Sequence, residues 1–166
     1  RPEPTNGQRQ LRPVAAVSNW METFRGVVFP WHCDHFGHMN VRWYGGFFDD
    51  AAFQIWTMLG HGMKSMEKDG FHTVIARSSI EYKQEIGPGD LFVIETGFVK
   101  CGTKSCTHLQ RMTNADTGAL HATQETVEVF FDASTRKAIP VPDKIRPVIE
   151  GALLSPYELT LSAGEL

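Results

Sequence analysis

The residues best suited to chemistry lie together between Trp31 and Asn40, in the order Trp-His-Cys-Asp-His-Phe-Gly-His-Met-Asn. This segment holds a carboxylate, imidazoles, a thiol and a carboxamide, and it directly precedes an apolar stretch that is typical of a helix. A helix start offers unpaired backbone N–H groups, which stabilise a carbonyl oxygen that gains negative charge during attack. Asp34 could reach the same point as a nucleophile or as a base for water, and His38 and Asn40 could orient the reacting groups. These features indicate acyl transfer or hydrolysis.

The flanking pattern predicts the elements that position this segment. Apolar residues recur at spacings of three and four over residues 41–60, which predicts a helix with Asn40 as its N-cap. Alternating patterns predict one strand before this helix and four after it, at residues 22–29, from just after residue 70 to about residue 86, and at 91–100, 105–114 and 119–132. The order favours an α+β domain in which one apolar helix packs on one antiparallel sheet. Such a sheet has an open edge, which dimerisation would cover.

Smaller features complete the predicted organisation. Val74, Ala76, Ser78, Ile80 and Tyr82 alternate along the chain, so we expect them on one face of a strand. Short helices are expected at residues 63–68 and 143–150. We expect residues 1–20 to form an extended or mobile N-terminal arm, residues 21–150 to form the domain, and residues 151–166 to form a C-terminal tail.

Composition excludes several classes of protein. The chain has 166 residues, which is the usual size of one domain, and its formal charge of −3 comes with scattered Lys and Arg. We therefore expect no nucleic-acid partner, and no stretch is apolar enough to predict a membrane span. The odd cysteine count, from Cys33, Cys101 and Cys106, is typical of thiols in a cytoplasmic protein. A disulfide between Cys101 and Cys106, which flank a predicted turn, is the alternative.

The motif Asp34-x-x-Gly37-His38-Met39-Asn40-x-x-x-Tyr44, with a strand before it and an apolar helix after it, resembles the 4-hydroxybenzoyl-CoA thioesterase branch of the hot-dog superfamily. The segments 80–90, which ends in Gly-Pro-Gly-Asp, and 136–146 are also similar to these enzymes. The resemblance covers residues 22–148. It implies a hot-dog fold, in which one long central helix is wrapped by a five-stranded antiparallel sheet.

The same resemblance implies an acyl-CoA thioesterase that needs neither a metal nor a redox cofactor. Asp34 matches the catalytic carboxylate, and the backbone N–H near Val41 matches the group that polarises the thioester carbonyl. His38 and Asn40 join Asp34 as expected catalytic residues, and the expected substrate-binding residues are Gly37, Val41 and Tyr44. The loop is also similar to that of plant acyl-carrier-protein thioesterases, but Phe36 stands where those enzymes have a catalytic Asn. The partners implied are an acyl-CoA substrate and a second copy, in a homodimer or a dimer of dimers with sites at the subunit interface.

Other interpretations remain open at this point. In another hot-dog branch the working acid lies about two turns into the helix, where Asp49 and Asp50 are the candidates. The His and Cys residues beside Asp34 are possible zinc ligands, although their spacing matches no familiar zinc motif. A hydratase or dehydratase would pair His38 with Asp34, and a non-catalytic acyl-CoA-binding dimer would need no carboxylate at the carbonyl. Candidate contacts for the CoA phosphates are Arg77, Lys83, Lys100, Lys104 and Arg111.

Overall fold

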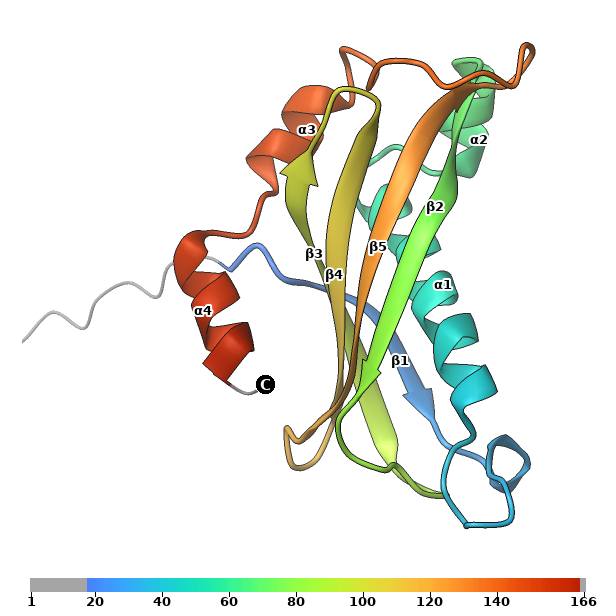
Figure 1. Cartoon of the computed structure of the whole chain (residues 1–166), viewed down its shortest axis with the longest axis vertical. Helices are drawn as coiled ribbons and strands as arrows, with labels where there is room; N and C mark the ends of the chain where they lie inside the picture. The colour runs from blue at the N-terminus through green and yellow to red at the C-terminus, as the bar shows by residue number, and fades with distance from the viewer. Residues whose placement is uncertain (1–17, 165–166) are drawn as a thin grey trace, which may run out of the picture.

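The structure is a computed structural model that describes residues 18–164 of the chain. In chain order its elements are β1 (Met21–Val27), a 3-10 turn (Pro30–His32), α1 (Val41–Met58), α2 (Met63–Lys68), β2 (Phe71–Tyr82), β3 (Leu91–Cys101), β4 (Ser105–Asn114), β5 (Leu120–Asp132), α3 (Arg146–Gly151) and α4 (Pro156–Gly164). Figure 1 shows these elements along the chain. None of the helices among the described residues is long and apolar enough to cross a membrane.

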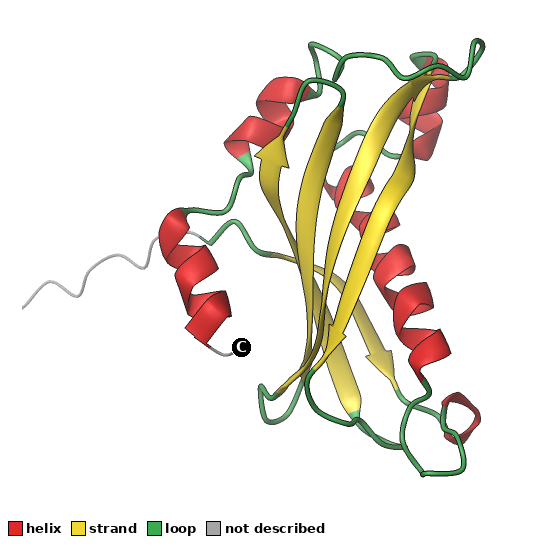
Figure 2. Cartoon of the chain, in the orientation of Figure 1, coloured by secondary structure: helices red, strands yellow, loops and turns green. Residues whose placement is uncertain are grey.

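The five strands form one antiparallel sheet in the order β1-β3-β4-β5-β2. The long helix α1 lies along one face of the strongly twisted sheet, and α4 lies on the opposite side (Figures 1 and 2). This is the hot-dog arrangement of a central helix against a wrapping sheet, so the predicted fold class is confirmed. β2 is an edge strand of the sheet, and its apolar residues Val74, Ile75 and Tyr82 are exposed.

Helix α1 forms because its apolar side chains return to one face every three or four residues. Tyr44, Phe48, Ala51, Ile55 and Trp56 are all buried against the sheet. The helix begins where Asn40 Oδ1 accepts a hydrogen bond from the Arg42 N–H at 3.2 Å, as predicted for an N-cap. Its observed end at Met58 is two residues before the predicted one.

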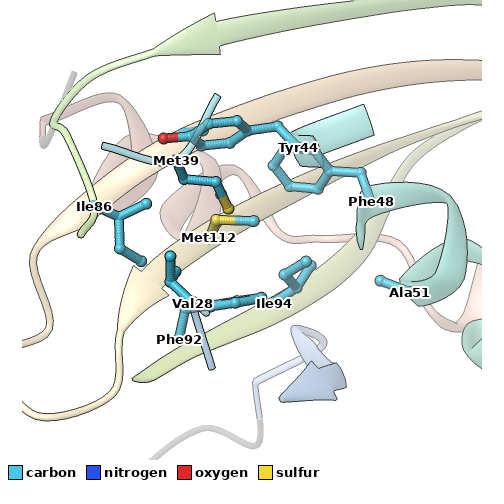
Figure 3. Packing of buried hydrophobic residues seen from close by; sticks show 10 residues of the cluster. Val28, Met39, Tyr44, Phe48, Ala51, Ile86, Phe92, Ile94 and Met112 are labelled. Atoms are coloured by element: carbon cyan, nitrogen blue, oxygen red, sulfur yellow. The ribbon is translucent and has the colours of Figure 1, made fainter. Parts of the chain in front are cut away.

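The core near the start of α1 holds the Asp34 loop against the sheet. Tyr44 and Phe48 of the helix pack with Met39 and Ile86 over Met112 of β4 (Figure 3). A second apolar cluster lies around Trp56 and Phe98 towards the other end of α1. The loop and the helix start are therefore fixed by the same buried side chains, which is what a preorganised site requires.

The sequence prediction for the long strand was wrong in one respect. A register shift between Ile75 and Arg77 marks a β-bulge, so alternation does not carry through Ala76. Val74 pairs with Val129 on the face away from α1, whereas Ser78, Ile80 and Tyr82 pair with Thr126, Gln124 and Ala122 on the face towards it. The strand begins at Phe71, as expected, but it ends at Tyr82 and not near Ile86, because residues 83–90 form the connection to β3.

The first described residues, before β1, contact the segment of α4 and the residues before it, on the face of the sheet away from α1. Asn19 donates its side-chain amide to the Leu153 carbonyl at 2.7 Å, and the Asn19 N–H binds the Glu158 carboxylate at 2.7 Å. The Trp20 ring lies under the Arg111 guanidinium at 4.4 Å. Most of the predicted N-terminal arm, residues 1–17, lies outside the described residues. The predicted tail contains α4, and the predicted helix at 143–150 is observed as α3.

Candidate active site

The Asp34 loop is a short hairpin between β1 and α1. The Gly37 N–H donates to the Asp34 carbonyl at 3.0 Å, and the Asp34 N–H donates to the His38 carbonyl at 3.1 Å. Gly37 has φ +82°, a conformation that favours glycine and closes this turn. The Met39 N–H donates to the Ile86 carbonyl at 2.8 Å, and this bond ties the loop to the chain that follows β2. The carboxylate is therefore carried on a braced loop.

Two donors hold the Asp34 carboxylate in place. Asn40 Nδ2 donates to Oδ2 at 2.9 Å, and the Phe36 N–H donates to Oδ1 at 3.0 Å. The hydrogen bond from Asn40, and to a smaller extent the one from Phe36, lowers the pKa of Asp34 below its ordinary value of 3.8. The carboxylate is thus ionised at neutral pH, the form needed by a nucleophile or a general base.

Asn40 joins this carboxylate to the helix start. Its amide nitrogen binds Asp34, while its amide oxygen accepts the Arg42 N–H. The Trp43 N–H donates to the Asn40 carbonyl at 3.0 Å. Within the described part of the chain, the Val41 N–H makes no such bond, so one donor at the positive end of the α1 dipole stays available.

Asp34 and Val41 line the same open cavity of about 560 Å³. His38 and Tyr44 also line it, and burial raises the pKa of Tyr44 to about 12, so its phenol remains a proton donor. The remaining lining residues are Phe36, Met39, Tyr82, Lys83, Gln84 and Glu85. A carboxylate, an unpaired N–H and a phenol around an apolar hollow can bind and attack an activated carbonyl group.

The structure places the other predicted site residues in different roles. His38 turns its Nε2 towards the Glu85 carboxylate at 3.1 Å, while the hydrogen bonds to Asp34 come from Asn40 and Phe36. Gly37 and Asn40 do not line the cavity, since Gly37 shapes the turn and Asn40 acts through Asp34. The contribution of Tyr82, Gln84 and Glu85, which follow the motif by about forty positions, was not predicted from the sequence. The only signal was the strand ending before Gly-Pro-Gly-Asp.

The residues of the other interpretations lie as follows in the structure. No group of His, Cys, Asp or Glu within the described residues is arranged to hold a metal ion. Cys101 and Cys106 face each other across the β3–β4 ladder as free thiols. Asp49 lines a different cavity of the same chain from the one that holds Asp34. Of the candidate CoA contacts, Lys83 lines the Asp34 cavity, whereas Arg77 and Arg111 line one on the opposite sheet face.

Known structures share this fold. The SAV2348 protein of Staphylococcus aureus, solved in complex with CoA, is 20% identical, with a TM-score of 0.75 over 87% of this chain and 94% of that chain. The DHNA-CoA thioesterase of Staphylococcus aureus is 20% identical, with a TM-score of 0.66 over 85% and 91%. The dihydroxynaphthoyl-CoA thioesterase Slr0204 of Synechocystis is 16% identical, with a TM-score of 0.68 over 77% and 94%. A comparison with curated protein sequences gives no match.

The helix and the wrapping sheet together define a hot-dog fold. Residues 28–149 match the model of the Thioesterase-like superfamily. The chain therefore belongs to the Thioesterase-like superfamily, and the prediction of a thioester hydrolase is confirmed at the level of the family.

Proposed function

We propose that this protein hydrolyses an acyl-CoA to a free carboxylate and CoA. The observation that carries the proposal is the ionised Asp34 carboxylate, held by Asn40 and facing the same cavity as the unpaired Val41 N–H. A thioester carbonyl bound at the helix start would accept that N–H. Its carbon would then be exposed to attack from the side of Asp34.

The reaction follows from these two groups. The Val41 N–H and the α1 dipole stabilise the negative charge that develops on the carbonyl oxygen. Asp34 attacks the carbonyl carbon itself, or it removes a proton from a water that does so. After direct attack, the C–S bond breaks to leave an anhydride between Asp34 and the acyl group, and water then hydrolyses this anhydride to the free carboxylate. After attack by water, the C–S bond breaks to give the carboxylate directly. In both cases the CoA sulfur leaves as a thiolate and takes up a proton, from solvent or from the Asp34 carboxyl group. Asn40 is a positioning residue because its amide fixes the orientation and charge of Asp34.

Two observations support CoA as the thiol carrier. SAV2348 binds CoA, and the other two structures compared above carry CoA thioesterase names. Lys83 is the one Lys or Arg among the described residues that line the Asp34 cavity, and its Nζ pairs with the Glu81 carboxylate at 2.6 Å. We assign Lys83 to a phosphate or the pantetheine arm of CoA. The cytoplasm, where CoA esters and free thiols coexist, is the compartment we propose.

The working unit is proposed to be a homodimer, which could assemble further into a dimer of dimers. The exposed edge of β2 carries unpaired backbone groups and the exposed side chains of Val74, Ile75 and Tyr82. Pairing of two β2 strands across a two-fold axis would cover this edge. Tyr82 lines the Asp34 cavity, so the partner would form one wall of each site. Sedimentation at micromolar concentration is expected to give the mass of two copies.

The test is thiol release from short, long and aromatic acyl-CoAs, run beside the hydration of an enoyl-CoA followed by absorbance. A thioesterase releases thiol and leaves the enoyl bond intact. The hydratase interpretation predicts the opposite pattern, and it is disfavoured because Asp34 pairs with Asn40 while His38 pairs with Glu85. Binding of CoA without turnover of any substrate would instead identify a non-catalytic binder.

A further inference from the structure

A second cavity lies at the other end of β2, with a volume of about 290 Å³. Its walls come from α1, the first residue of α2 and the first half of β2, and Glu128 of β5 forms part of its lining. The lining residues are Asp49, Ala52, Phe53, Trp56, Met63, Thr73, Val74, Ile75 and Glu128. Most of these side chains are apolar or aromatic, and only two of them, both carboxylates, carry charge.

Glu128 is an unusual group to find in this position, because only 4% of its surface is exposed. Burial opposes its ionisation, yet the hydrogen bonds from His108, Thr73 and Trp56 together outweigh that effect and lower its pKa. The His108 Nε2 and Trp56 Nε1 atoms lie 2.9 and 3.1 Å from the carboxylate oxygens. Glu128 is thus an ionised carboxylate beneath the cavity, and its two oxygens are engaged by His108 and Trp56.

Asp49 adds a second carboxylate at the cavity wall. Burial raises its pKa, and the negative charges of Asp50 and Glu128 raise it further. Among the described residues that line the cavity, none is Lys, Arg or His. His108, which lies beneath the lining, pairs with Glu128, so Asp49 is the carboxylate that the lining leaves without a cation. The indole of Trp56 and the half-exposed ring of Phe53 are beside the two carboxylates, and aromatic faces attract organic cations.

We propose that this cavity binds an organic ammonium group, carried at the far end of the acyl chain of the thioester. An ammonium group would pair with Asp49, near the buried Glu128 carboxylate, while its alkyl substituents contact Trp56 and Phe53. A metal ion would gain nothing from the aromatic wall, and an anion would be repelled by the carboxylates.

The link between the cavity and the acyl chain rests on the proposed function and its β2–β2 dimer. The two cavities occupy opposite ends of β2, with Thr73 to Ile75 at one end and Tyr82 at the other. Antiparallel pairing centred on the strand places Thr73 of one protomer opposite Ile80 of the other. The cavity lined by Asp49 and Glu128, called the carboxylate cavity below, would then adjoin the Asp34 cavity of the partner protomer. It would lie in the direction in which an acyl chain extends from the carbonyl.

The experiment compares two CoA thioesters of nearly the same shape. One carries a trimethylammonio-butanoyl group, and in the other a carbon atom replaces the nitrogen. We expect wild type to prefer the cationic thioester by about tenfold in kcat/KM. Asp49→Asn is expected to abolish this preference through KM, while the rate with the neutral thioester stays within about twofold.

Asp50→Asn is the matched control, because it removes the same charge one residue away at a position that does not line the cavity. It is expected to keep the preference for the cationic thioester. Equal rates of wild type with both thioesters, or an equal loss with both in Asp49→Asn, would overturn the proposal. Calorimetric titration with tetramethylammonium tests whether the bound cation is a free molecule and not part of the substrate. If tetramethylammonium binds in an Asp49-dependent way while the enzyme shows no preference for the cationic thioester, the cation is a separate effector, and its proposed place on the acyl chain is refuted.

The same substrates separate this inference from the proposed function. Asp34-dependent release of thiol from the neutral thioester, without any preference for the cation, would remove the ammonium site and leave the thioesterase in place. No thiol release from either substrate would contradict the proposed function itself.

Discussion

Asn40 offers the sharpest separation of catalysis from stability, because one side chain makes two different hydrogen bonds. Its amide nitrogen donates to Asp34 at 2.9 Å, and its amide oxygen caps α1 through the Arg42 N–H at 3.2 Å. Serine at this position keeps a capping oxygen but is too short to donate to Asp34. Alanine loses both bonds. The two variants therefore share a defect at the carboxylate and differ at the helix cap.

The expected magnitudes follow from these contacts. Asn40→Ala loses the cap, which costs about 1 kcal/mol of unfolding free energy and about 2–4 °C in Tm, whereas Asn40→Ser stays within about 0.5 kcal/mol of wild type. Both variants lose the main hydrogen bond that orients Asp34, so kcat is expected to fall roughly tenfold or more in each. Urea unfolding and initial rates of thiol release measure the two effects independently.

The pH dependence gives a further check on Asn40. Activity needs ionised Asp34, whose pKa in the folded protein lies below 3.8, so the wild-type rate falls only when the pH drops through that lowered pKa. Without the Asn40 donor the pKa rises, and the fall in kcat/KM begins at higher pH in both variants. An Asn40→Ser protein whose kcat equals that of wild type, and whose kcat/KM falls at the same acidic pH, would refute the positioning role of Asn40.

Three predictions concern the structure around the site. Glu128→Ala leaves His108 without its acceptor in the core and is expected to lower the unfolding free energy in urea by about 3–5 kcal/mol; a change below about 1 kcal/mol would contradict the buried network. Gly97→Ala would place a methyl group 2.6 Å from the Leu154 side chain and cost about 1–3 kcal/mol, part of which Leu154→Ala should restore. The Glu158 carboxylate has a pKa of about 2 against an ordinary 4.5, so its stabilisation is complete above about 4.5 and is lost as the pH falls towards 2. Thermal unfolding of Glu158→Gln should lack this part of the acid dependence, and an unchanged pH profile would exclude it.

The sequence predicted those parts of the fold that depend on local periodicity. The spacing of Tyr44, Phe48 and Ile55 is enough to define α1, and alternation located all the strands. The bulge at Ala76 was not predictable in the same way. A single extra residue does not visibly interrupt the alternation of the small and apolar side chains in this strand. The cap at Asn40 was predicted, since its chemistry depends on adjacent residues.

The same distinction between local and distant sequence patterns applies to the residues of the candidate site. Asp34, His38 and Val41 were found because they are close in sequence and precede a helix. Tyr82 and Glu85 were missed as cavity residues because the sheet brings them to the loop from a distant strand. The carboxylate cavity was missed for the same reason: Asp49 and Glu128 come from α1 and β5, and neither residue has a neighbour in sequence that signals the other.

The central claim is that the Asp34 carboxylate acts on a thioester held at the Val41 N–H. Its most direct test is the rate of thiol release from an accepted acyl-CoA by wild type, Asp34→Asn and the control Asp50→Asn, with folding of each checked by circular dichroism. The account predicts that Asp34→Asn keeps the fold and lowers kcat by about 10² or more, while Asp50→Asn keeps the wild-type rate. A folded Asp34→Asn protein that releases thiol as fast as wild type would contradict it.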